Sequence, residues 1–171
     1  EYDELDISNN DIKNILNFSS FKLDGAAIIN QFDRILNLNY FDGKLHGNQL
    51  VFNTDNKLRF IGTYKDGYIH GKYAIFNNYK QVEEGYMEHG IHDKNITIVN
   101  TSELSKTIYP LKRGMLHGKY VERINFVEIK LSYKYGIFDG TFHLSDITHG
   151  ETVTLIIYNS NNFYYSKMKF G

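Results

Sequence analysis

A short pattern that recurs along this chain constrains its fold more than any other feature. Three copies, DGKLHG, DGYIHG and RGMLHG, begin at Asp42, Asp66 and Arg113, and two related copies, HGIHDK and YGIFDG, begin at His89 and Tyr135. The first glycine of each copy recurs every 22 to 24 residues, at Gly43, Gly67, Gly90, Gly114 and Gly136. This period is too short for a pair of helices, but it fits two strands and two turns.

The Asp-Gly pairs in the repeat predict tight two-residue turns between antiparallel strands. Asp-Gly is among the strongest hairpin signals, because a type I′ turn needs positive φ at both central residues. With Asp66-Gly67 as the turn, we predict that Lys65 faces Tyr68 and that Gly62 faces Gly71. Since successive side chains of a strand alternate between faces, this register gathers the apolar residues on one face. That face then contains Leu58, Phe60, Gly62, Tyr64, Ile69, Gly71, Tyr73 and Ile75.

The repeat therefore predicts an all-β fold, an elongated single-layer antiparallel sheet of about six stacked β-hairpins. In this prediction the first glycine of a copy lies in the turn, and the second lies among aromatic residues. A glycine on a sheet surface leaves a notch, and we expect a neighbouring ring to lie across it and so stack one hairpin on the next. The structural turn glycines are Gly43, Gly47, Gly67, Gly71, Gly114, Gly118, Gly136 and Gly140.

The two ends of the chain depart from the repeat. Residues 1–20 are acidic and rich in asparagine, and they predict a cap segment that is irregular or helical, with a helical turn at Ile12–Leu16. Residues 21–171 form the predicted repeat domain, which ends in a hairpin around Asn159–Asn162. Atypical ends are expected in repeat proteins, because the terminal repeats cover an otherwise exposed sheet.

Composition and motifs argue against several classes of function. The chain has 19 Lys and Arg against 20 Asp and Glu, a net charge of −1, which argues against a nucleic-acid partner. It has no cysteine, which excludes disulfides, thiolate catalysis and cysteine-ligated metals. No run of about 18 apolar residues predicts a membrane span. No nucleophile elbow or phosphate-binding loop occurs, so we expect no catalytic residue, no enzyme activity and no cofactor.

The recurring histidines also predict no metal site. Equivalent positions of adjacent hairpins lie about 10 Å apart, whereas the donor atoms around one zinc ion lie within about 4 Å of each other. His46 and His70 therefore cannot share an ion. The stretch Glu83–Asp93 is different, because it places His89 and His92 among carboxylates. It fits either a weak metal or proton-relay site or a solvated acidic stretch, and we favour the second interpretation.

The tyrosines of the apolar face are the candidate binding residues. Tyrosine is enriched at protein interfaces, so these rings could form an aromatic groove for a peptide or a helix. The alternative, which we favour, is that most of the rings fill the curve of the sheet, because a one-layer sheet has little else to bury. The candidates are Tyr40, Tyr64, Tyr73, Tyr120 and Tyr133.

The segment YKDGYIHGKY at Tyr64–Tyr73 resembles the MORN repeat, in particular its bacterial variant. A unit of that family has about 23 residues, with a tyrosine, an Asn/Asp-Gly pair and a second glycine that usually follows a histidine. The segments that begin at Tyr40 and Leu111 are similar, and the resemblance covers roughly residues 23–145. Two copies depart from it, because Asp93-Lys94 replaces His-Gly in one and Asp139 replaces the histidine in another.

The resemblance implies a non-catalytic scaffold that binds another protein along its sheet. Bacterial proteins with such repeats are described as antitoxin-like or as exported and envelope-associated, so localisation is left open between the cytoplasm and the envelope. One alternative is a peripheral module that binds membrane phospholipid, as linked to some eukaryotic members, and it requires a basic patch. Another is homo-oligomerisation through exposed sheet edges.

Overall fold

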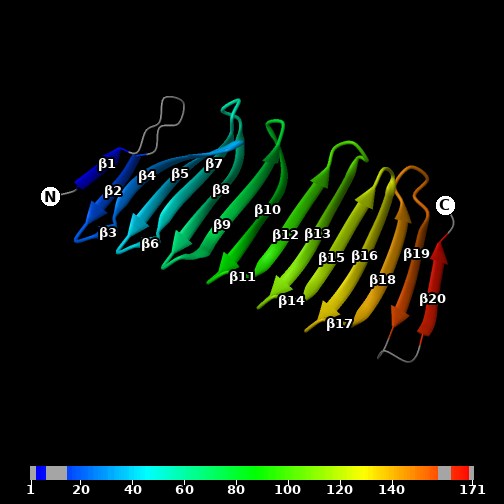
Figure 1. Ribbon diagram of the computed structural model, residues 1–171. Coiled ribbons are helices and arrows are strands. Elements are labelled where there is room, and N and C mark those ends of the chain that lie inside the picture. Colours follow the sequence, from blue (N-terminus) through cyan, green and yellow to red (C-terminus); the bar gives the residue numbers. More distant parts are fainter. Residues whose placement is uncertain (1–2, 7–14, 158–162, 170–171) are drawn as a thin grey trace. The chain divides into compact units, whose positions relative to one another are not determined.

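The computed structural model describes the backbone of residues 3–6, 15–157 and 163–169 and the side chains of residues 15–154 (Figure 1). The chain divides into two compact units, an N-terminal unit (Glu1–Gly90) and a C-terminal unit (Ile91–Gly171). Throughout the described ranges the secondary structure is β, without a helix, and the strands of each unit pair antiparallel, which confirms the predicted fold class. No helix of the described chain is long and apolar enough to cross a membrane.

The N-terminal unit contains the first ten strands, which pair in the order of the chain and lie side by side (Figure 1). In most hairpins the second strand, called here the return strand, is split into a two-residue piece and a longer piece. The strands are β1 (Asp3–Asp6), β2 (Ile15–Ser19), β3 (Lys22–Leu23), β4 (Gly25–Gln31), β5 (Arg34–Phe41), β6 (Lys44–Leu45), β7 (Gly47–Asn53), β8 (Leu58–Lys65), β9 (Tyr68–Asn77) and β10 (Lys80–Glu88).

The C-terminal unit repeats the same scheme with the remaining strands. Its return strands are split in the same way, since each short piece precedes a longer one. The strands are β11 (Ile91–His92), β12 (Lys94–Asn100), β13 (Ser105–Lys112), β14 (Met115–Leu116), β15 (Gly118–Ile124), β16 (Val127–Lys134), β17 (Ile137–Phe138), β18 (Gly140–Asp146), β19 (Thr152–Ile157) and β20 (Phe163–Lys169).

The predicted turns are present, but the predicted register holds only beside them. Asp66 and Gly67 have φ of 53° and 90°, as a type I′ turn requires, and Lys65 faces Tyr68 as predicted. Further from the turn, Gly62 faces Tyr73 and not Gly71, so the prediction is wrong there by two residues. The same offset separates the pairs Tyr40–Leu45 and Leu36–Val51 in the preceding hairpin. Because side chains alternate with a period of two, an offset of two leaves the predicted faces unchanged.

The offset arises at the second glycine of each repeat, which has a left-handed backbone. Gly47, Gly71, Gly118 and Gly140 have φ between 76° and 118°, a range that side-chain-bearing residues rarely adopt. Extra residues on one strand bulge out at this point and the pairing resumes beyond them. In the copy that lacks this glycine, Lys94 adopts a φ of 66°. That conformation is strained for a lysine.

The predicted contact between rings and second glycines is wrong. A Cβ on Gly71 would lie 3.5 Å from Cβ of Thr63, and one on Gly118 would lie 3.3 Å from Cβ of Pro110. No atom of an aromatic ring comes within 4 Å of the Cβ position at Gly47, Gly71, Gly118 or Gly140. These glycines are therefore required for their backbone conformation and not for a notch on the surface.

Rings do cover two other glycines, and these contacts build the core of the N-terminal unit. Gly62, Tyr73 and Gly85 lie opposite one another on β8, β9 and β10. The ring of Tyr73 lies on Gly85, and its side chain is buried, with 5% of the residue exposed. The ring of Phe60 covers Gly62 in the same way. The single-layer sheet thus buries its own aromatic side chains against bare backbone.

Consecutive repeats within a unit are joined at their turns by a backbone hydrogen bond. The first glycine of each repeat donates its N–H to a backbone carbonyl of the preceding repeat. In the preceding repeat, that carbonyl belongs to the residue two positions after the one that is equivalent to the donating glycine. The N···O distances are 2.7 to 2.9 Å, and the pairs are Gly43–Leu23, Gly67–Leu45 and Gly90–Ile69 in the N-terminal unit and Gly114–His92 and Gly136–Leu116 in the C-terminal unit. The hairpins therefore stack through the main chain at the turn edge.

At the N-terminus the structure corrects the expected cap segment. The sequence predicts an irregular or helical segment, whereas β1 and β2 are strands that pair with each other, Leu5 facing Leu16. Part of the expected helical turn, Ile15 and Leu16, therefore lies in a strand. Pairing with a neighbouring strand overrides the weak local propensity of so short a segment. Residues 12–14 and the hairpin tip expected around Asn159–Asn162 lie outside the described residues.

We predict that Gly85→Ala destabilises the protein by about 1–3 kcal/mol, because its Cβ would lie 2.6 Å from Cε1 of Tyr73. Without that ring, alanine is the better residue in a strand, since glycine loses more backbone freedom on folding. In a Tyr73→Leu background, Gly85→Ala should therefore be neutral or stabilising. Chemical denaturation of the four proteins of this double-mutant cycle measures the coupling, and equal costs in both backgrounds would contradict the contact.

Candidate functional site

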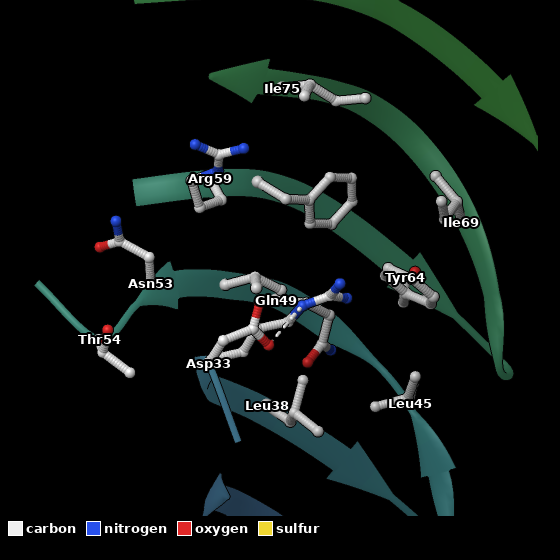
Figure 2. Close-up of a pocket in the computed structure, with 13 residues that line it drawn as sticks. Asp33, Leu38, Leu45, Gln49, Asn53, Thr54, Arg59, Tyr64, Ile69 and Ile75 are labelled. Carbon is white, nitrogen blue, oxygen red and sulfur yellow. Dashed lines mark ion pairs between the residues drawn. The ribbon is translucent and has the colours of Figure 1, made fainter. Parts of the chain in front are cut away.

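A hollow of about 720 Å³ lies on one face of the N-terminal unit, over strands β5 to β9 (Figure 2). Most of its walls are side chains that alternation along the strands places on one face, and Arg59 joins them where the register between β7 and β8 shifts by one residue. The lining residues are Asp33, Arg34, Leu38, Leu45, Gln49, Val51, Asn53, Thr54, Arg59, Phe60, Tyr64, Ile69 and Ile75.

The floor of the hollow is apolar, because cross-strand pairing brings together large side chains from three strands. Val51, Phe60 and Ile75 face one another across β7, β8 and β9. Nearer the turn, Tyr64 faces Ile69. Each of these side chains is half-buried, so it contributes apolar surface to the hollow while it packs against its neighbours.

Gln49 is a buried polar residue in this apolar floor, with 2% of the residue exposed. Its Oε1 accepts the N–H of Asn39 at 2.7 Å, and its Nε2 donates to the carbonyl of Asn39 at 2.9 Å. The bulge at Gly47 leaves Leu38 and Asn39 without partners on β7, since β5 pairs with β7 only up to Asn37, and the N–H of His46 donates to the carbonyl of Asn39 in this gap. The side-chain amide of Gln49 thus takes the place of the peptide group that β7 lacks here, and it ties β7 to β5 under the hollow.

Two arginines lie at the end of the hollow away from the repeat turns. Arg34 forms an ion pair with Asp33 at 3.4 Å, drawn as the dashed line in Figure 2. Arg59 is exposed, and it has no ion pair with any residue in the described part of the chain. The hollow therefore joins an apolar floor to a guanidinium that is available to an acceptor.

The structure places the five candidate tyrosines in different environments. Tyr64 lines the hollow, whereas Tyr40 belongs to the same face of β5 but does not line it. Burial raises the pKa of both hydroxyls above the usual value. Tyr73 is a core residue whose hydroxyl donates to Oε1 of Glu83 at 2.7 Å. Its pKa is raised by burial and, to a smaller extent, by this carboxylate. Tyr73 is therefore not accessible to a partner.

Tyr120 and Tyr133 belong to an aromatic row on the C-terminal unit. The ring of Tyr120 lies edge-on to Tyr109 at 5.4 Å and to Tyr133 at 6.4 Å, and Tyr133 contacts Phe138 at 5.8 Å. The hydroxyl of Tyr120 donates to Oε2 of Glu122, and burial, followed by this hydrogen bond, raises its pKa. Edge-on rings stabilise one another, so this row accounts for the packing of one face.

Side chains at three of the histidine positions of the repeat, His70, Asp93 and His117, contact the turn of the next repeat. The ring of His117 contacts that of Tyr135 at 4.6 Å, and its Nδ1 accepts the N–H of Tyr135 at 3.4 Å. Where aspartate replaces histidine, Asp93 accepts the N–H of Arg113 at 3.0 Å. In the part of the chain that the structure describes, no three His, Cys, Asp or Glu residues are grouped so as to hold a metal ion.

Sequence reasoning did not identify Gln49, Arg34 or Arg59. Gln49 follows Gly47 by two positions, and the residues two positions after Gly25 and Gly71 in the neighbouring hairpins, Ala27 and Tyr73, are also buried. A polar residue at a position that is otherwise apolar is a signal that could have identified it. The two arginines adjoin turns of variable sequence, and no repeat pattern marks them.

We predict that Gln49→Leu destabilises the protein by about 1–3 kcal/mol, because it leaves the N–H of Asn39, inside the part-buried sheet, without its acceptor. Leucine has a similar volume, so a cavity does not explain the loss. Hydrogen exchange at the Asn39 amide should accelerate together with the fall in stability. The exposed Gln81→Leu serves as the control and should change stability by less than about 0.5 kcal/mol. Unchanged exchange at Asn39 would contradict this role of Gln49.

No family model matches the chain, and no curated protein matches it. The resemblance to MORN repeats therefore depends on the repeated residues themselves. Any function has to be argued from the surfaces of the two units.

Proposed function

We propose that this protein is a non-catalytic module that binds a segment of another protein, and that the hollow of the N-terminal unit is the binding site. The observation that carries this proposal is the combination of an apolar floor with unpaired Arg59 at one end. The similarity of the repeats to MORN repeats, whose role is scaffolding, supports the same function.

The size and chemistry of the hollow fit side chains of a peptide. Binding sites for small ligands and anchoring side chains are typically about 300–1,000 Å³, mostly apolar, with a few polar groups that fix orientation. The hollow of about 720 Å³ falls in this range. Leu38, Val51 and Ile75 offer apolar surface that is otherwise in contact with water. Burying this surface under a partner is favourable in proportion to the area removed from water.

The arginines specify the chemistry of one end of the partner. A guanidinium binds a carboxylate through paired, charge-assisted hydrogen bonds. Since Arg34 already has Asp33 beside it, Arg59 is the stronger candidate for an acidic group of the partner. We therefore propose a segment with apolar anchors followed by a carboxylate. The rigid sheet underneath fixes the distance between the two.

We predict that Ile69→Gln weakens partner binding about tenfold, because it places an amide in the apolar floor. Ile61→Gln is the matched control, since Ile61 lies on the opposite face of β8 and is 37% exposed. Peptides selected from a random displayed library against the wild-type protein provide the ligands, and fluorescence anisotropy measures their dissociation constants. The selected peptides should carry apolar residues and an acidic residue. Equal effects of the two variants would contradict binding in the hollow.

A second candidate function, peripheral binding to anionic membranes, is favoured by the turn edge of the C-terminal unit. Exposed apolar side chains follow the first glycine of successive repeats, at Ile91, Met115 and Ile137. Lys112 and Lys134 face Met115 and Ile137 across the turns. Apolar side chains with adjacent cations are suited to a membrane interface, since they insert while the lysines meet anionic headgroups.

For this second function we predict that Ile137→Asp lowers cosedimentation with vesicles of phosphatidylcholine and phosphatidylserine. An aspartate at the turn edge removes apolar surface and repels the anionic lipid. Ile147→Asp is the control, because Ile147 is also exposed but lies at the opposite end of the hairpins. Binding that is absent from the wild type, or equally reduced in both variants, would exclude this function for the turn edge.

A further inference from the structure

The C-terminal unit carries a pocket of about 210 Å³ on the face opposite its aromatic row. The pocket lies over three adjacent strands, β13, β15 and β16. Cross-strand pairing builds it from two rows, Lys106–Arg123–Glu128 and Ile108–Val121–Lys130. These six residues line the pocket. Its floor is thus aliphatic and its walls are charged.

Glu128 is a buried carboxylate that holds two of the cations in place. Only 7% of its side chain is exposed, and it forms ion pairs with Arg123 and with Lys130. The pKa of Glu128 is lowered, chiefly by the hydrogen bond from Lys130. The Nε of Arg123 donates to Oε2 of Glu128, which leaves the terminal nitrogens of the guanidinium uncommitted to this carboxylate.

The charges of the pocket do not cancel. Lys106, Arg123 and Lys130 carry three positive charges against the one negative charge of Glu128, so the balance is 3 − 1 = +2. Lys106 has no ion pair with any described residue, and it lies directly opposite Arg123. Like charges placed directly opposite each other on a sheet are destabilising. An anion bound between these cations would therefore relieve their repulsion.

We propose that this pocket binds a phosphate group. A phosphate monoester carries about −1.5 to −2 charges at neutral pH and offers three acceptor oxygens, which matches both the excess charge and the three cationic side chains. The pocket of about 210 Å³ is smaller than a typical site for a whole organic ligand of about 300–1,000 Å³, so it suits the phosphate group and not the rest of the molecule. Glu128 acts as a positioning residue, because it orients Arg123 and Lys130.

The test is a titration of the ¹⁵N-labelled full chain with inorganic phosphate at constant ionic strength, in which phosphate replaces chloride. We expect saturable shifts of the backbone amides of β13, β15 and β16. Lys106→Met keeps the aliphatic part of the side chain and leaves both ion pairs of Glu128 intact, and it should weaken phosphate binding about tenfold. Lys106→Arg keeps the charge and should restore the affinity.

Lys119→Met is the matched control, because Lys119 is an exposed lysine on the same face of β15 that does not line the pocket. It should change the affinity less than twofold. Shifts that do not saturate, or equal losses in Lys106→Met and Lys119→Met, would overturn the proposal, since they would show only general attraction to a basic surface. Thermal unfolding of each variant separates a lost site from a lost fold.

Vesicles distinguish the source of the phosphate group. Phosphatidic acid presents a phosphate monoester, whereas phosphatidylserine presents none. Cosedimentation with phosphatidic acid vesicles that exceeds binding to phosphatidylserine vesicles of equal charge, and that is lost in Lys106→Met, assigns the site to a lipid headgroup. Saturable binding of free phosphate without this difference assigns it to a soluble phosphate ester. The site is excluded if both probes fail to bind.

Discussion

The left-handed residue at the second glycine of each repeat is the constraint on which the rest of the structure depends. It lies four residues beyond the first glycine, and its positive φ makes the return strand bulge and then resume pairing two residues further on. Because the offset is even, the apolar side chains on the two sides of the bulge remain on one face. The bulge also opens a gap in the ladder, which the side chain of Gln49, two residues after Gly47, fills at Asn39. Ala27, Gln49 and Tyr73 each follow a left-handed glycine by two residues, and all three are buried.

The buried residues of the N-terminal unit follow from this gap and from the absence of a second layer. A single sheet offers few places to bury a side chain, so burial is concentrated where backbone is bare or a ladder bond is missing. Tyr73 lies on Gly85, and Gln49 completes the ladder at Asn39. Larger apolar side chains between these points remain half-buried and form the hollow. The same constraint that specifies the fold therefore leaves an apolar surface that a partner can cover.

Much of the fold could be predicted from the sequence, because Asp-Gly turns and alternating side chains are local signals. The faces near the turn were predicted correctly, but the register beyond Gly71 was not, since offsets of zero and two place every side chain on the same face. The predicted face of Leu58 was wrong, because a one-residue shift pairs it with Phe52 and not with a residue of the face that carries Val51 and Phe60. Gly62 and Gly85 were missed as ring contacts because they lie outside the recurring motif. Arg59 was missed because its role depends on the shape of the hollow and not on spacing. Of the five tyrosines, Tyr64 alone lines that hollow.

The net charge of the chain conceals how its charges are distributed. Residues 91–171 contain 10 Lys and Arg and 7 Asp and Glu, or 10 − 7 = +3, whereas residues 1–90 contain 9 and 13, or 9 − 13 = −4. Alternation along a strand then separates charge from aromatic surface, so that Lys106, Arg123 and Lys130 share the face opposite the tyrosine row. The net charge of −1 therefore does not describe this face, whose cations are suited to an anionic partner. Successive side chains of a strand point to opposite faces of the sheet, so a partner meets only the charges of every second residue. The net charge of a single-layer sheet therefore has to be counted separately for each face.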